Sequence, residues 1–192
     1  MAGFESALTD NLLRLEEELR TQTHRPGPYR YFRMTSPKPR RISAAPFRDR
    51  VVHHALVQQL EPIFEARFIQ DSYACRVGKG THAALQRCQD LARRYPYVLQ
   101  CDVVQFFPAV DHAILRDLLF RTIADAQTRW LIEHILASDA GVLRDEYTVV
   151  YFPDDDLLSA LRPRGLPIGN LTSQFWANCS LNALDQLIKR DL

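Results

Sequence analysis

The chain has 192 residues, of which 46% are apolar and 24% are charged, and its formal net charge is +1. These values describe an ordinary globular protein with one large or two small domains. No apolar run is long enough to span a membrane, and four scattered cysteines without a C-x-x-C pair argue against a zinc site and a secreted disulfide framework. The acidic, amphipathic N-terminus is unlike a secretory signal, so we expect a reducing, cytoplasmic setting.

Hydrophobic periodicity and turn residues predict an α+β chain in which helices alternate with few strands. In chain order, the predicted elements are a helix over residues 4–20, a strand over 29–34, a helix over 53–68, a helix over 81–94, an apolar strand over 97–104, helices after Asp111 and over 128–137, a loop or hairpin over 138–164, and a helix over 170–189. Pro62 should kink or split its helix, whereas Thr81 and Asp111 should cap theirs.

Three helices should each turn one apolar face toward the core. These faces consist of Leu56, Leu60, Ile63 and Phe64; of Leu85, Cys88 and Leu91; and of Ala177, Leu181, Leu184 and Ile188. Trp130 and Trp176 are expected in the core, whereas His53 and His54 are expected on the helix surface.

Basic residues are concentrated between Arg25 and Arg50, where eight stand against the single acid Asp49, with four aromatic residues interleaved. Basic groups with aromatic neighbours suit a phosphate backbone and stacked bases. The pattern therefore predicts a site for nucleic acid or a nucleotide, and a solvated basic loop is the alternative.

A carboxylate follows the predicted strand over 97–104, in the segment from Cys101 to Pro108. An unpaired carboxylate is costly to bury, so Asp102 should face a cation, a donor or a cleft. Read alone, the pattern allows a metal-binding Asp beside an aromatic wall or an Asp that merely caps a turn.

The segment from Arg164 to Gln174 is a Gly- and Pro-rich turn that leads into a helix. Such a helix N-terminus offers free N–H groups to an anion, and glycines allow a ligand or a backbone to approach closely. An ordinary capped junction between a loop and a helix is the alternative.

Taken in order, four segments resemble the reverse-transcriptase family over about Tyr29 to Leu192. Lys38 to Leu56 is similar to a fingers motif, and Asp71 to Ala84 resembles the next block. Asp102 to His112 is similar to the first palm motif, and Gly165 to Asn178 to the motif beneath the template and the incoming nucleotide. The resemblance implies fingers and a partial palm of a right-hand polymerase, helix-rich with a small antiparallel sheet. Residues 1–28 would be an N-terminal helical extension, 29–96 the fingers and 97–192 the partial palm.

The resemblance also implies a role for each matching residue. The metal ligands would be Asp102, as the catalytic carboxylate, and the carbonyl of Val103, binding Mg²⁺ or Mn²⁺. Phe107 would be the steric gate that selects deoxynucleotides. Arg40 or Arg41, with Lys38 as a further candidate, would bind the triphosphate, and Gly169 would line the nucleotide pocket. The template and primer contacts would be Arg48, Arg50 and Gln174. The implied partners are an RNA template, a DNA or RNA primer and dNTPs.

The second palm motif of the family, an aromatic residue, any residue, then Asp-Asp, does not appear before Leu192, and neither does a thumb. Tyr151 to Asp156 is similar to it but precedes Gly165, has one residue too many and contains a proline. An acidic loop is the simpler interpretation. We therefore expect a nucleotidyltransferase fragment, an RNA-directed DNA polymerase by family that is inactive in isolation. The alternative is a non-catalytic RNA-binding module derived from a reverse transcriptase.

The pattern from Ile168 to Gln174 is similar to the reverse transcriptases of diversity-generating retroelements, in which an apolar residue replaces a common Gln. This subtype implies a small basic accessory protein and error-prone copying at adenines. A retron or group II intron enzyme stays open. We hypothesise that Ile168 relaxes base-pair checking. If glutamine at this position in a full-length enzyme leaves misincorporation unchanged, the hypothesis fails.

Overall fold

The fold is described from a computed structural model that covers residues 2–36, 39–148, 150, 158 and 161–190. Its elements are α1 (Ala2–Glu5), α2 (Leu8–Arg20), β1 (Arg30–Met34), β2 (Arg40–Ala44), α3 (Phe47–Glu65), α4 (Thr81–Arg94), α5 (Phe106–Ala109), α6 (His112–Phe120), α7 (Ala126–Asp139), the 3₁₀ turn η1 (Arg144–Glu146) and α8 (Leu171–Arg190). The chain is helix-rich with a small antiparallel sheet, which confirms the predicted α+β class. Among the described helices, none is both long and apolar enough to cross a membrane.

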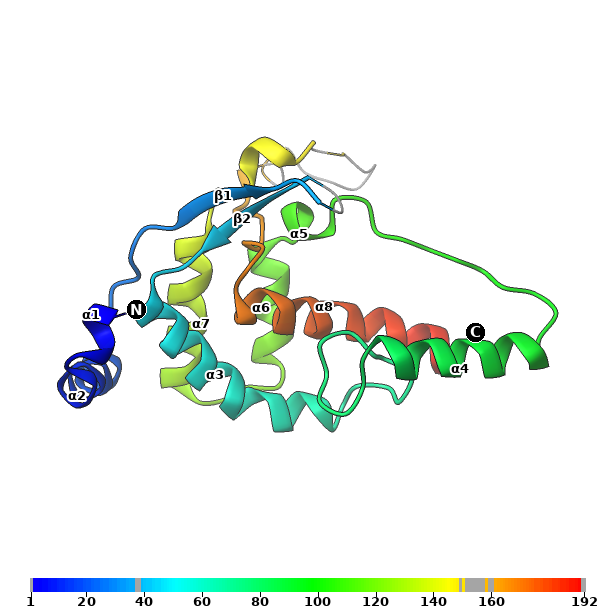
Figure 1. The fold of residues 1–192 in the computed structure, drawn as a ribbon, viewed down its shortest axis with the longest axis horizontal. Coiled ribbons are helices and arrows are strands. Elements are labelled where there is room, and N and C mark those ends of the chain that lie inside the picture. The colour runs from blue at the N-terminus through cyan, green and yellow to red at the C-terminus, as the bar shows by residue number, and fades with distance from the viewer. Residues whose placement is uncertain (1, 37–38, 149, 151–157, 159–160, 191–192) are drawn as a thin grey trace.

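The core lies where α3, α6, α7 and α8 pack together beneath the β1–β2 hairpin (Figure 1). Trp176 of α8 is fully buried, and Phe175 meets Phe64 of α3 edge to face at 5.5 Å between ring centroids. Asp111 and Asp125 cap α6 and α7, because each side chain accepts backbone N–H groups of its helix. The caps fix where α6 and α7 begin, and both helices contribute buried apolar residues to the core.

The hairpin pairs β1 with β2 in antiparallel register, with Arg30 opposite Ala44 and Met34 opposite Arg40. It lies over the N-terminal end of α8 and above α5 in Figure 1. The predicted strand over 29–34 is thus confirmed. The sheet positions the basic stretch of the sequence above the helical core.

The predicted strand over 97–104 is wrong, since residues 97–103 form an exposed irregular segment. A strand needs a neighbour to accept its backbone hydrogen bonds, and no described strand lies beside it. In Figure 1 the segment is part of an extended connection that returns from the far end of α4 to α5.

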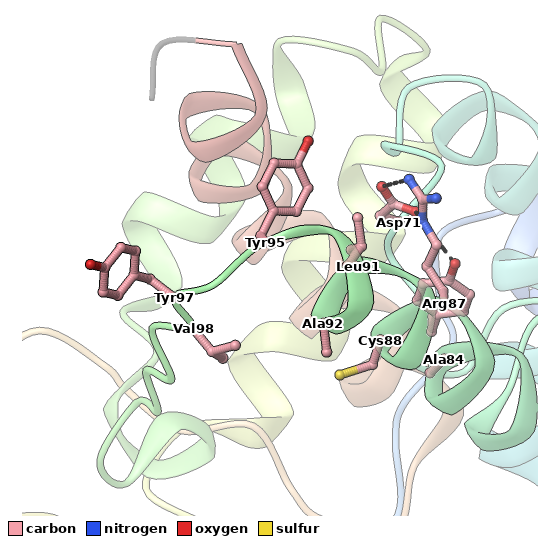
Figure 2. Close-up of a pocket in the computed structure, with 10 residues that line it drawn as sticks. Asp71, Ala84, Arg87, Cys88, Leu91, Ala92, Tyr95, Tyr97 and Val98 are labelled. Atoms are coloured by element: carbon pink, nitrogen blue, oxygen red, sulfur yellow. Dashed lines mark hydrogen bonds and ion pairs between the residues drawn. The ribbon is translucent and has the colours of Figure 1, made fainter.

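The predicted inward face of α4 is also wrong, because no residue of this helix is buried. Leu85 is 55% exposed, and Cys88 and Leu91 line an open pocket of about 460 Å³ together with Tyr95 and Tyr97 (Figure 2). The helix spans the predicted residues, with Gly80 rather than Thr81 at its N-cap position. Its periodicity therefore identified a helix but not a burial partner.

Two further expectations need correction. The helix α3 begins at Phe47 and continues through Pro62. Proline there leaves the carbonyl of the exposed Gln58 unpaired, which water can satisfy, and only three residues follow before the helix ends. On α8 the buried side consists of Phe175, Trp176 and Cys179 with their neighbours, whereas Leu184 and Ile188 are exposed.

Candidate functional site

The turn before α8 is hydrogen-bonded to the segment around α5. Leu166 N donates to Phe107 O at 2.8 Å, and Gly165 N donates to Val110 O at 2.9 Å. The buried ring of His112 lies 2.7 Å, through Nε2, from Gly165 O. The structure thus joins the two segments that resemble the first palm motif and the following nucleotide-site motif. Phe107 is half-buried and packs against the core.

The same turn then lies against β2. Ser43 N donates to Ile168 O at 2.8 Å. Gly169 has φ +119°, and a Cβ atom placed on it would come within 2.8 Å of Ile42 Cγ2. Only glycine adopts this backbone easily, and only glycine allows this approach. The segment that resembles the fingers motif is therefore in direct contact with Gly169.

A buried polar network holds this contact in place. Asn170 is 1% exposed; its Oδ1 accepts from Ala45 N at 3.4 Å and its Nδ2 donates to Tyr29 Oη at 3.1 Å. The Tyr29 hydroxyl in turn donates to Asp139, at the end of α7. Burial raises the pKa of Tyr29, and the neighbouring Asp139 raises it further. The network ties β1, β2 and α7 to the start of α8.

Asp139 gives this network a pH dependence, because burial raises the pKa of its carboxyl from 3.8 to about 7. The folded chain holds the proton more tightly than the unfolded chain, so this residue's contribution to stability should fall as the pH rises from about 4 to about 7. Relative to the wild type, Asp139→Asn should therefore gain roughly 1–4 kcal/mol across that window and nothing more above it. Urea unfolding at several pH values measures this difference. Asp10→Asn, at an exposed position, is the control. A stability difference between Asp139→Asn and the wild type that stays constant with pH would contradict the prediction.

The register of the hairpin separates its arginines onto two faces. One face carries Tyr31, Arg33, Arg41 and Ser43, and the other carries Arg30, Phe32, Met34, Arg40, Ile42 and Ala44. Because Gly169 contacts Ile42, the second face is the one that borders the turn before α8. We call this second face, together with Phe47 and Arg50 beside it, the open face.

The two candidate triphosphate arginines have different surroundings. Arg41 is bound to the 142–146 segment: its guanidinium donates to Val142 O, and its Nε lies 3.1 Å from Glu146 Oε1. Arg40 is exposed on the open face and pairs with no carboxylate among the described residues. Arg40 is therefore the one of the two with its charge available to a ligand. Lys38 lies outside the described residues.

The predicted template and primer residues also differ. Arg48 forms an ion pair with Glu18 of α2. Arg50 is exposed, with its guanidinium carbon 5.4 Å from the ring centroid of Phe47. A cavity of about 460 Å³ on this side of the hairpin is lined by Arg30, Phe32, Ala44, Pro46, Phe47 and Arg50, among others. Gln174 is exposed on the first turn of α8.

Asp102 lies on the exposed segment after α4, where its Oδ1 accepts from the N–H group of Val103 at 3.0 Å. Within the described residues, no three His, Cys, Asp or Glu side chains are grouped so that they could hold a metal ion. Mg²⁺ needs several oxygen ligands in near-octahedral geometry. One exposed carboxylate and a neighbouring carbonyl supply only part of such a ligand set, and the role of Asp102 and Val103 as metal ligands stays a prediction. Tyr151 to Asp156 lies outside the described residues.

Sequence reasoning missed the network beneath the hairpin. Tyr29 appeared only as one of several aromatics, and Asn170 only as part of a turn. Asp139 lay beyond the predicted end of its helix, where an acid resembles an ordinary loop residue. The absence of helix-breaking residues through Asp139 was the available signal that the helix extends to a buried position.

Comparison with known proteins relates the chain to intron proteins. No protein-family model matches it. It is 36% identical over 115 residues to nuclear intron maturase 1, mitochondrial, of Arabidopsis thaliana, covering 58% of this chain and 16% of the relative. It is 26% identical over 186 residues to protein YkfC of Escherichia coli, covering 91% of this chain and 44% of the relative. It is 25% identical over 183 residues to the group II intron-encoded protein LtrA of Lactococcus lactis, covering 93% of this chain and 28% of the relative.

The chain thus spans less than half the length of each of these relatives. The matches support the reverse-transcriptase resemblance at the coarse level of intron maturases and group II intron-encoded proteins. They do not extend to the diversity-generating subtype, which stays a prediction.

Proposed function

We propose that this chain forms the RNA-binding fingers and the first part of the palm of a reverse-transcriptase-type protein of the intron-encoded kind. The observation that supports the proposal best is the contact between Gly169 and Ile42. It places the exposed arginines of the open face beside the turn that resembles the family's nucleotide-site motif. The relatedness to intron maturases and a group II intron-encoded protein agrees with RNA as the partner.

The chemistry of the open face suits a single-stranded nucleic acid. Arg30, Arg40 and Arg50 form no ion pair with described residues, so their charges are available to phosphate groups. Phe32 is 51% exposed on the same face and can stack on a base. Phe107 packs against the core beneath the neighbouring turn and would limit the space around a bound sugar. The proposed template is RNA, and primer and dNTPs would bind the whole protein.

The open face can be tested by RNA binding. We expect Arg30→Gln, Arg40→Gln and Arg50→Gln each to weaken binding of a single-stranded RNA. Each should also reduce the slope of log K against the logarithm of the salt concentration by about one, since one phosphate contact is lost. Arg121→Gln is the matched control, since Arg121 is exposed at the far end of α6. Fluorescence anisotropy at several salt concentrations measures both quantities. Equal losses in the control and in the three variants would contradict the assignment of this face.

Polymerase activity of the chain alone is a separate question. One exposed carboxylate cannot hold the metal ions that nucleotidyl transfer requires, so we expect no primer extension by these 192 residues with either Mg²⁺ or Mn²⁺. A product that disappears in Asp102→Asn would show that the chain contains a complete catalytic centre. RNA binding without extension agrees equally with part of a polymerase and with a binding module derived from one. Restoration of extension by the rest of the protein distinguishes these two.

A further inference from the structure

Three histidines from different segments gather beside the N-terminal helices, away from the open face. His24 lies in the link between α2 and β1, His53 lies on α3 and His134 lies on α7. His24 is 1% exposed and His53 is 3% exposed. The rings of His24 and His134 are 6.2 Å apart, and Trp130 stacks on His134 at 5.2 Å between centroids. We call these three residues the histidine cluster.

The cluster holds the α2–β1 link on the first turns of α3. His24 Nδ1 lies 3.7 Å from Glu18 Oε2, and His24 Nε2 lies 3.7 Å from Asp49 Oδ1. Asp49 Oδ2 accepts from Gly27 N at 2.7 Å, and Glu18 pairs with Arg48. Polar contacts around His24 thus contribute to the attachment of this link to α3.

The charge balance of the site depends on the protonation of its histidines. The site contains two carboxylates, those of Glu18 and Asp49, and two guanidinium groups, that of Arg48 paired with Glu18 and that of Arg25 near His134. With neutral histidines the site is therefore balanced. A first proton on His24 would lie between two carboxylates, but a second one on His53 or His134 would face a cationic His24.

The imidazoles of the cluster are also incompletely hydrogen-bonded. His24 Nδ1, His53 Nδ1 and His134 Nε2 have no hydrogen-bond partner among the described residues. Burial lowers the pKa of all three; for His53, burial together with the nearby His24 and the exposed His54 lowers the pKa to about 4. A histidine whose pKa in the folded chain lies below its ordinary value of 6.5 is harder to protonate there than in the unfolded chain. It therefore stabilises the fold above about pH 6.5, and this contribution is lost as the pH falls toward 4.

We propose that the histidine cluster is a proton-sensitive attachment that holds the N-terminal helices and the α2–β1 link on α3 while its histidines are neutral, and releases them when a second histidine is protonated. The release is expected to be local, because the cluster joins the link to the start of α3 and to α7, whereas the apolar side chains of α3, α6, α7 and α8 hold the main core together. The inference does not depend on RNA binding.

Hydrogen exchange of the full chain tests the release. The Gly27 amide is hydrogen-bonded across the attachment, to Asp49 Oδ2 of α3, and the amides of Thr23 and His24 donate to Glu18 O within the segment that would be released. The Ser43 amide, bonded to Ile168 O, serves as the internal reference. After correction for intrinsic rates, we expect protection of the first three to fall at least about tenfold between about pH 7.5 and pH 5, with Ser43 unchanged. Equal losses at all four amides, or no loss, would overturn the proposal.

Variants test which groups are responsible. His53→Gln should remove most of the pH-dependent loss of protection. Asp49→Asn should instead shift this loss to higher pH, because the first proton, on His24, then has one carboxylate partner fewer in the attached state and is harder to accommodate there. His82→Gln, at an exposed histidine of α4, should change nothing. If His53→Gln does not fold, the Asp49→Asn shift decides the matter, and its absence overturns the proposal. Fluorescence of Trp130 should fall with the same midpoint, and His134→Gln should abolish that change.

Discussion

Replacing Gly169 with alanine is expected to destabilise the fold by about 2–5 kcal/mol, because the substitution adds two costs. The backbone at Gly169 has φ +119°, a conformation that side chains rarely tolerate. The new Cβ would also lie 2.8 Å from Ile42 Cγ2. That methyl belongs to a β-branched side chain in a paired strand, so it cannot simply rotate away. Either the strand or the turn must move.

Gly141→Ala separates the two costs. Gly141 has φ +81°, but a Cβ placed there meets no atom within 4 Å. Gly141→Ala should therefore lower the free energy of unfolding by only about 1–2 kcal/mol, from backbone strain alone. Urea unfolding of both variants measures the difference, and RNA binding by Gly169→Ala under folding conditions reports whether the open face has shifted. Equal destabilisation by the two substitutions would show that contact with β2 does not depend on a glycine.

Local rules predicted much of the helical framework. The helices near residues 8–20, 81–94, 126–139 and 171–190 follow from apolar periodicity. The helix after Asp111 also follows from its cap, whose side chain bonds to backbone groups only two or three residues away. A short strand over residues 29–34 was also predicted, whereas its partner β2 was not. These signals are contained in short windows of sequence.

Features that depend on distant partners were missed. The apolar pattern of residues 97–104 suits a strand, yet a strand forms only beside another one. His53 looked like a surface residue, but it is buried, with His24 of the distant α2–β1 link nearby. Likewise, the ordered motifs predicted that Gly169 would matter, whereas its contact with Ile42 requires two segments more than 120 residues apart in the sequence. The bond between Tyr29 and Asp139 likewise joins residues 110 positions apart.

Replacing Trp176 with alanine should have the largest effect on the core. Trp176 is fully buried at the centre of the cluster formed by α3, α6, α7 and α8. Truncating a buried tryptophan removes favourable burial and leaves a cavity, at a cost of about 3–5 kcal/mol. Domains are usually stable by only about 5–15 kcal/mol, so the variant should be marginally folded. Since α8 begins two residues after Gly169, weakened packing there should also loosen the turn against β2.

Unfolding of Trp176→Ala can be followed through Trp130, the remaining tryptophan of the chain. Leu184→Ala on the same helix is the matched control: its side chain is 45% exposed, and its loss should cost no more than about 1 kcal/mol. A Trp176→Ala effect as small as this control would mean that α8 does not hold the core together. Hydrogen exchange at Ser43, whose amide bonds to Ile168 O, should rise in Trp176→Ala but not in Leu184→Ala. That pattern would connect packing at the middle of α8 to the contact between the hairpin and the turn at its N-terminus.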